Sequence, residues 1–228
     1  MAEPSTLLAS ARQLPWWPAA RDNLAALWAS NGASARRETL ARAYRSVYAG
    51  NRAAMVVDVV VSRQRHYTTR VVALVRSFQA SQVTSLSDLA AIGTVPVGGL
   101  RGGESDTIVG VAAGLVAWNQ ARPTAASDDE TLVSEWAAYA APFDVAPRLD
   151  PFVGRVKGIG PALFAYLRMR SGGDAIKPDG RVRDRLKQLG FEPPAGEVGL
   201  LLTAKAAAEE LGVRRIELDQ LLWPLPAR

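Results

Sequence analysis

The sequence predicts an all-α protein. Hydrophobic residues recur at spacings of three and four along most of the chain, whereas the strict alternation typical of strands is almost absent. The chain has 228 residues, of which 48% are hydrophobic. It is therefore long and apolar enough to form one large domain or two small lobes around a real core.

The first helices are expected after a lead-in rich in Pro and Trp. This lead-in, residues 1–20, contains Trp16 and Trp17, which we expect to pack on the body of the protein. A short helix is predicted for Arg21–Ser30, and a second for Ser34–Gly50 with Ser34 as its N-cap.

The most hydrophobic segment is Ala53–Val61, which is apolar nearly all round and predicts a buried central helix. The polar run Ser62–Tyr67 follows this helix, and polar surface loops often carry binding or catalytic residues. A further helix is expected after it, to about Ala80. The later helices expected are Thr84–Ala91, Glu104–Gln120, one opened by Asp128, Asp129 and Glu130, Asp150–Val156, Pro161 to about Ser171, Gly180–Leu189, Val198–Leu211 and Arg215–Leu222.

The composition excludes several classes of protein. The chain contains no cysteine, which rules out disulfides, cysteine-ligated zinc and cysteine-ligated iron–sulfur clusters. No run of 18 or more apolar residues is present, so we expect no membrane-spanning helix. The first residues lack a basic start and a long apolar run, so we expect no signal peptide and a cytoplasmic location.

Positive charge is concentrated in one part of the chain. Residues 148–187 contain ten Lys or Arg and four Asp, a net charge of +6, against +5 for the whole chain, so the remainder carries about −1. Such clustering is typical of a surface that binds a nucleic-acid backbone.

A glycine turn lies within this basic region. In the sequence VKGIGP, Gly158 and Gly160 precede a helix that begins at Pro161. The amino end of a helix presents unpaired N–H groups, and glycines allow an anion to approach them, so the pattern predicts a phosphate site. The alternative is an ordinary tight turn between helices.

The region resembles the helix-hairpin-helix/Gly-Pro-Asp superfamily of DNA glycosylases. Within that superfamily it is most similar to the endonuclease III-like enzymes, but without their iron–sulfur cluster. The features that carry the resemblance are the hairpin VKGIGPALFAYL, the Gly172-Gly173 loop and Asp179 within IKPDGRVRDRL. Weaker support comes from Val61–Gln64, Ser87–Ala90 and Glu104–Gln120, which follow the order of the family.

The resemblance implies a two-lobed helical fold. Residues 52–170 would form one helical lobe ending in the hairpin, and residues 1–51 with 171–228 would form the terminal lobe. The partner implied is double-stranded DNA, bound by a monomer associated with the nucleoid.

The resemblance also assigns roles to single residues. Asp179 would stabilise the oxocarbenium ion that develops as an N-glycosidic bond breaks, and would orient the attacking water. The alternative for Asp179 is a plain helix N-cap. The residues implied to contact DNA are Arg155, Val156, Lys157, Gly158, Ile159, Gly160, Pro161 and Ala162, together with Gln64 and His66.

Four side chains outside the hairpin carry open alternatives. Gln64 would fill the space left by a flipped nucleotide, or lie at a solvated helix end. His66 is expected to contact the DNA backbone or to cap structure, rather than to act as a base. Trp118 and Tyr166 are candidates for a base pocket, or for core packing.

One departure from the family's sequence pattern bears on which reaction is expected. Ala162 occupies the position where bifunctional members carry an attacking Lys, which favours a monofunctional glycosylase. The alternatives are a non-catalytic DNA-binding protein and a bifunctional glycosylase/lyase that uses Lys157 or Lys177.

No cofactor is expected, apart from a monovalent cation at the backbone carbonyls of Gly154, Val156 and Ile159. The sequence does not identify the base.

Overall fold

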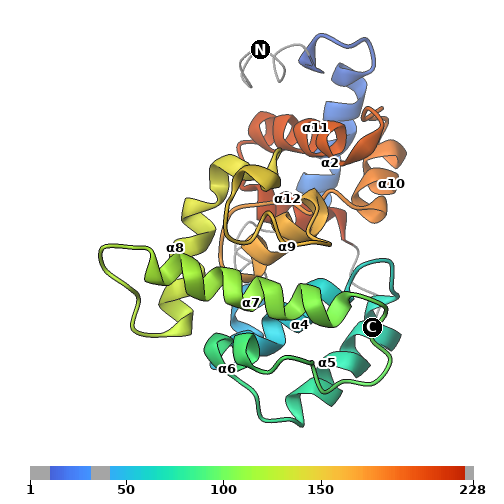
Figure 1. The fold of residues 1–228 in the computed structure, drawn as a ribbon. Coiled ribbons are helices and arrows are strands. Elements are labelled where there is room, and N and C mark those ends of the chain that lie inside the picture. The colour runs from blue at the N-terminus through green and yellow to red at the C-terminus, as the bar shows by residue number, and fades with distance from the viewer. Residues whose placement is uncertain (1–10, 32–41, 224–228) are drawn as a thin grey trace. The chain divides into compact units, whose positions relative to one another are not determined.

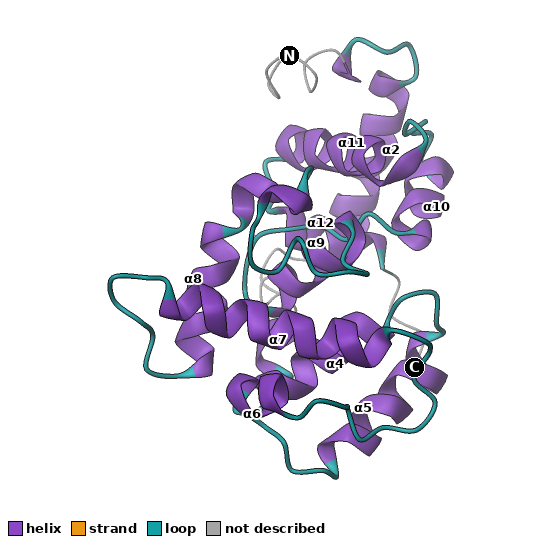
Figure 2. Cartoon of the chain, viewed as in Figure 1, coloured by secondary structure: helices purple, strands orange, loops and turns teal. Residues whose placement is uncertain are grey.

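The described structure is entirely helical. The computed structural model describes residues 11–31 and 42–223. Within these ranges every regular element is a helix and no strand occurs, as Figure 2 shows. The prediction of an all-α protein is therefore confirmed. None of the described helices combines the length and apolar character needed to cross a bilayer.

The chain divides into two compact units. The internal unit is Arg45–Gly173, and the terminal unit combines Met1–Tyr44 with Asp174–Arg228.

Helix α4 (Arg52–Val61) forms the centre of the internal unit. All ten of its residues are buried, as its nearly uniform apolar sequence predicts. It contacts α5 (Val72–Gln79), α7 (Glu104–Gln120) and α9 (Pro161–Arg170), and Figure 1 shows α7 lying against it. The other elements of this unit are the π-helix η1 (Tyr67–Val71), α6 (Leu86–Ala91), α8 (Asp129–Tyr139) and the short 3-10 helices η2 (Ala141–Phe143) and η3 (Pro147–Leu149).

In the described part of the terminal unit, four helices pack around an apolar cluster. They are α2 (Trp17–Ser30), α10 (Gly180–Gln188), α11 (Gly196–Leu211) and α12 (Arg215–Leu222). The indole of Trp17 meets the ring of Phe191 edge-on, with centroids 5.3 Å apart, and Trp16 also packs against Phe191. The expectation that both tryptophans pack on the body is confirmed.

Two predicted helices differ from the structure: one begins earlier than expected, and the other does not form. Helix α2 begins at Trp17 rather than Arg21, because Pro18 lies in its first turn, where the missing N–H costs nothing. The segment expected as the helix Asp150–Val156 forms a series of turns instead. The helix expected for Ser34–Gly50 lies partly outside the described residues, and its residues 42–46 are helical.

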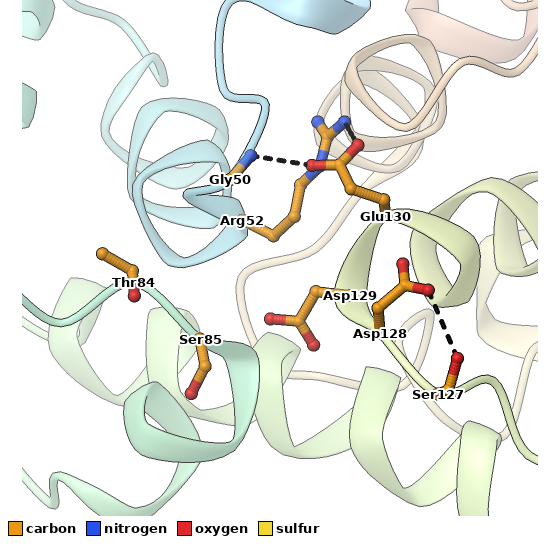
Figure 3. Close-up of a pocket in the computed structure, with 8 residues that line it drawn as sticks. All are labelled: Gly50, Arg52, Thr84, Ser85, Ser127, Asp128, Asp129 and Glu130. Atoms are coloured by element: carbon orange, nitrogen blue, oxygen red, sulfur yellow. Dashed lines mark hydrogen bonds and ion pairs between the residues drawn. The ribbon is translucent and has the colours of Figure 1, made fainter.

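Three helix amino ends of the internal unit meet around a polar pocket of about 360 Å³, shown in Figure 3. The carboxylate of Asp128 caps α8 by accepting the N–H of Thr131. Asp129 accepts the N–H of Leu86 at the start of α6, at 2.8 Å. Glu130 pairs with Arg52 at the start of α4. Each acidic side chain of the pocket therefore has a capping or pairing role, which makes the pocket a joint between helices.

A buried ion pair joins α9 to the region after α8. The guanidinium of Arg168 is paired with Asp144, and their side chains are only 2% and 7% exposed. Arg168 also donates to the carbonyl of Ala137 at 3.0 Å. A buried charge that loses its partner keeps its full desolvation cost.

Asp144→Ala is therefore expected to lower the free energy of unfolding by about 3–5 kcal/mol, because it leaves the Arg168 guanidinium buried and unpaired. Urea denaturation followed by circular dichroism measures the change. The matched control is Glu135→Ala, which breaks the exposed pair with Arg122 and should cost less than about 1 kcal/mol. Equal losses for the two variants would contradict the prediction.

Candidate nucleic-acid interface and the Asp179 carboxylate

The glycine turn is built around a left-handed residue. Gly158 has φ +96°, and a Cβ added there would lie 2.7 Å from the hydroxyl oxygen of Thr107. Both the backbone conformation and the space therefore require glycine at this position. The N–H of Ile159 donates to the carbonyl of Val156 at 3.0 Å and closes the turn, and Ile159 itself is buried.

Gly160 directly precedes α9. Its φ is −113°, an extended conformation open to any residue, and it is the N-cap of α9. No side chain caps this helix, and Pro161 at its start has no N–H to satisfy. The first turn of α9 is therefore an uncapped helix amino end beside the exposed side chains of Arg155 and Lys157.

Helix α7 provides the surface on which this turn rests. A Cβ at Gly114 would lie 2.6 Å from the carbonyl oxygen of Phe152, and one at Gly110 would lie 2.9 Å from the side chain of Val156. The Thr107 hydroxyl lies 2.8 Å from the carbonyl oxygen of Lys157, to which it can donate. The sequence analysis did not identify this contact surface, although the spacing of three and four places these α7 residues on one face of a helix.

Asp150 holds the turns that replace the expected helix. Its buried carboxylate accepts the N–H groups of Phe152, Val153 and Gly154 at 3.0–3.1 Å. A Cβ at Gly154 would lie 1.7 Å from the carbonyl oxygen of Pro147. The chain is thus folded too tightly here for a regular helix. Asp150 caps backbone N–H groups that belong to turns rather than to a helix.

Gln64 occupies the tip of the polar loop after α4. It is exposed and has φ +52°, one of two non-glycine residues in the described chain with a positive φ. The guanidinium of Arg101 donates to the carbonyls of Arg63 and Gln64, both at 3.3 Å. Left-handed backbone in a residue other than glycine is strained, and such strain is found most often at functional sites.

A buried ion pair fixes the base of the same loop. Arg65 and Glu104 are paired, with side chains 6% and 1% exposed, and Arg65 also donates to the carbonyl of Val61 at 3.0 Å. Glu104 accepts the backbone N–H of Arg101 at 2.7 Å. Burial raises the pKa of Glu104, but the hydrogen bonds from Arg65 and Arg101 outweigh it and hold the pKa below its usual value.

The first turn of α7 therefore holds both segments that were expected to contact DNA. Glu104 binds the base of the Gln64 loop, and the hydroxyl of Thr107, one turn later, lies 2.8 Å from the carbonyl of Lys157 and 2.8 Å from that of Gly103. Two segments almost a hundred residues apart in sequence are thus attached to adjacent positions on one helix.

The remaining candidates of the internal unit have structural partners. The ring nitrogen Nδ1 of His66 lies 3.2 and 3.1 Å from the hydroxyls of Thr68 and Thr69. Trp118 is buried against Tyr139.

Tyr166 belongs to a buried polar network. Its hydroxyl donates to Asp58 at 2.8 Å and accepts from Arg170. Trp118 and Tyr166 are thus core residues, the second of the two interpretations considered for them.

Asp179 lies in the terminal unit, as the N-cap of α10. Its Oδ1 accepts the N–H groups of Arg181 and Val182 at 3.0 and 3.1 Å. Its Oδ2 lies 3.7 Å from the ammonium of Lys177, and its side chain is 21% exposed. The carboxylate is therefore held in one orientation and remains accessible.

A second carboxyl, which the sequence analysis did not identify, lies close to Asp179. Asp219 of α12 is buried, and its Oδ1 accepts the backbone N–H of Lys177 at 3.0 Å. Burial and the charge of Asp179 raise the pKa of Asp219 to about 7, although Lys177 and Gln220 act in the opposite direction. Within the described residues, no group of three or more acidic or histidine side chains is placed to hold a metal ion.

The comparisons with known proteins give no match. Neither the protein-family models, nor the curated proteins, nor the solved structures contain a sequence or fold that matches this chain. The functional argument therefore depends on the residues and their geometry.

The raised pKa of Asp219 predicts a pH-dependent stability. The folded carboxyl keeps its proton up to about pH 7, whereas an unfolded aspartate loses it near the ordinary value of 3.8. The folded state therefore binds more protons between these values, so the contribution of Asp219 to the free energy of unfolding falls as the pH rises through this window.

Asp219→Asn removes this titration. Urea denaturation at pH 4.5 and pH 7.5 should show that the stability of the variant relative to wild type rises with pH, by an amount on the order of a few kcal/mol. A stability difference that does not change between the two pH values would contradict the raised pKa.

Proposed function

We propose that the chain is a monofunctional DNA glycosylase, which flips a damaged or modified base from double-stranded DNA and hydrolyses its N-glycosidic bond. The observation that carries the proposal is the first turn of α7, where Glu104 and Thr107 hold the Gln64 loop and the glycine turn on one helix. In this proposal the glycine turn and the amino end of α9 bind a phosphate, since main-chain N–H groups position a duplex without reading its sequence.

Gln64 is the group that enters the DNA stack. Its exposed position on a loop fixed by Arg101 and by the Arg65–Glu104 pair suits a side chain that must occupy the space of an extruded nucleotide. A wedge that is already held in place loses less conformational freedom on binding than a mobile one. The exposed guanidinium of Arg101 adds positive charge beside it.

Asp179 carries the chemistry in this proposal. Breaking the N-glycosidic bond leaves positive charge on the sugar, and a fixed carboxylate stabilises that charge and orients the attacking water. The Asp179 side chain is 21% exposed and so can be reached for this role; Oδ1 accepts the N–H groups of the cap, and Oδ2 faces the ammonium of Lys177. No cofactor is needed. A monovalent cation at the carbonyls of Gly154, Val156 and Ile159 would support the turn.

Two observations favour water over lysine as the nucleophile. Ala162 has no amine in the first turn of α9. The ammonium of Lys177 is only 12% exposed and is paired with Asp179, whereas Schiff-base formation needs an accessible neutral amine. Lys157 is exposed and is the remaining candidate for a lyase. Borohydride trapping tests it, and a covalent protein–DNA adduct would replace the monofunctional proposal.

A non-catalytic DNA-binding protein is the second candidate. The observation that favours it is that Asp179 already has a structural role as the cap of α10. For either function we propose double-stranded DNA as the partner. We further propose that the protein binds it as a monomer, in the cytoplasm at the nucleoid.

Asp179→Asn separates the two candidates. Asn is about as good an N-cap as Asp, so the variant should fold normally and bind duplex DNA with nearly unchanged affinity. Its rate of base release should fall at least about 100-fold, because the fixed negative charge is lost. The measurement is abasic-site formation on a panel of duplexes, each with one defined lesion. Undiminished release by the variant would show that Asp179 is not the catalyst.

Gly158→Ala tests the backbone contact. The substitution forces a left-handed alanine against Thr107, so the affinity for every duplex should fall alike, by roughly tenfold. The salt dependence should not change, because no charge is lost. Lys157→Ala should instead reduce the slope of log affinity against log salt by about one.

The control for both variants is Gly98→Ala, since a Cβ at Gly98 meets nothing within 4 Å. Thermal unfolding of each variant shows whether it is folded at the assay temperature. An effect of Gly158→Ala confined to one DNA sequence would contradict a role in binding the backbone.

A further inference from the structure

The segment before α10 is tied to α12 at both ends. At one end Asp174 accepts the N–H of Ile216, in the first turn of α12, at 3.0 Å. At the other end Asp219 of α12 accepts the N–H of Lys177 at 3.0 Å. Two carboxylates, one from the segment and one from the helix, thus fix residues 174–179 along α12.

The backbone of Lys177 is also hydrogen-bonded to Asp179. The carbonyl of Lys177 accepts the N–H of Asp179 at 2.8 Å across Pro178, which forms a three-residue turn. Asp179 in turn accepts two N–H groups of α10. Two hydrogen bonds, one at the N–H and one at the carbonyl of Lys177, therefore connect Asp219 to the backbone of Asp179.

Burying the Asp219 carboxyl costs free energy, which indicates that its hydrogen bonds have a specific role. Asp219 is 2% exposed and lies among Leu218, Leu221 and Leu222, all of which are buried. A buried carboxyl is expensive unless its oxygens are used. Its Oδ1 is used for the Lys177 N–H, and its Oδ2 accepts the side-chain amide of Gln220 at 3.1 Å.

We infer that Asp219 is the positioning residue for Asp179: by holding the N–H of Lys177, it fixes the turn at Pro178 and thereby the orientation of the Asp179 carboxylate. The inference rests on the proposed function, because it assigns a catalytic purpose to that orientation. Asp219 does not touch the reacting atoms. Either protonation state of its carboxyl keeps an oxygen on the Lys177 N–H, so the hold does not depend on ionisation.

The test uses two substitutions of Asp219 in the full-length protein. Asp219→Leu is close in volume and removes the acceptor, so single-turnover base release should fall at least tenfold while the dissociation constant for duplex DNA stays within about threefold. Asp219→Asn keeps the acceptor oxygen and should recover most of the lost rate. Wild-type release by Asp219→Leu, or equal losses in both variants, would overturn the inference. If Asp219→Leu fails to fold, Asp219→Ala takes its place.

Asp174→Leu is the matched control, because it removes the other carboxylate tie between the same segment and α12. It should lower the unfolding stability without lowering the rate of base release. A rate as low as that of Asp219→Leu would show that any weakening of the segment is sufficient, which would overturn the specific role of Asp219.

Amide hydrogen exchange separates this inference from the proposed function. Asp219→Leu should accelerate exchange at the N–H groups of Lys177 and Asp179 at least tenfold, whereas Asp174→Leu should not. If wild-type protein releases no base from any duplex in the panel, the proposed function fails, and exchange alone decides the positioning role. Unchanged protection at Lys177 and Asp179 in Asp219→Leu would overturn it.

Discussion

The close packing of main chain against α7 is the constraint on which the candidate interface depends. The backbone at Phe152 reaches the helix at a distance that a Cβ at Gly114 would prevent, and the side chain of Val156 does so at Gly110. This approach brings the carbonyl of Lys157 to the hydroxyl of Thr107 and leaves the amino end of α9 uncapped. A hairpin held in this way is rigid because its support is a helix rather than another loop.

Buried charges fix the loops of the internal unit. The Arg65–Glu104 pair holds the Gln64 loop, and the buried carboxylate of Asp150 holds the turns before α9. Such groups are costly to desolvate, and removing one partner leaves the other unsatisfied. In the proposed function, loops that are held in one geometry lose less conformational freedom when they meet a duplex.

In the terminal unit, one geometry serves both interpretations of Asp179. An N-cap must point its carboxylate at the first N–H groups of a helix, and here this uses Oδ1 while the side chain stays partly exposed. Capping and catalysis are thus compatible, since the cap supplies the fixed orientation that electrostatic catalysis requires. The buried Asp219 adds a second layer of support behind the same turn.

The sequence alone determined the helical class, most helix positions, the buried character of α4 and the cap at Asp179, because periodicity, apolar runs and capping residues are local signals. Only the tertiary structure decided that Asp150–Val156 forms turns and that Glu104 and Thr107 join two distant loops. Only the tertiary structure also shows that Asp219 accepts the backbone N–H of Lys177. These features depend on contacts between residues far apart in sequence, such as Thr107 with Lys157. Local propensity carries no information about such contacts, since the partner supplies the packing and the hydrogen bond.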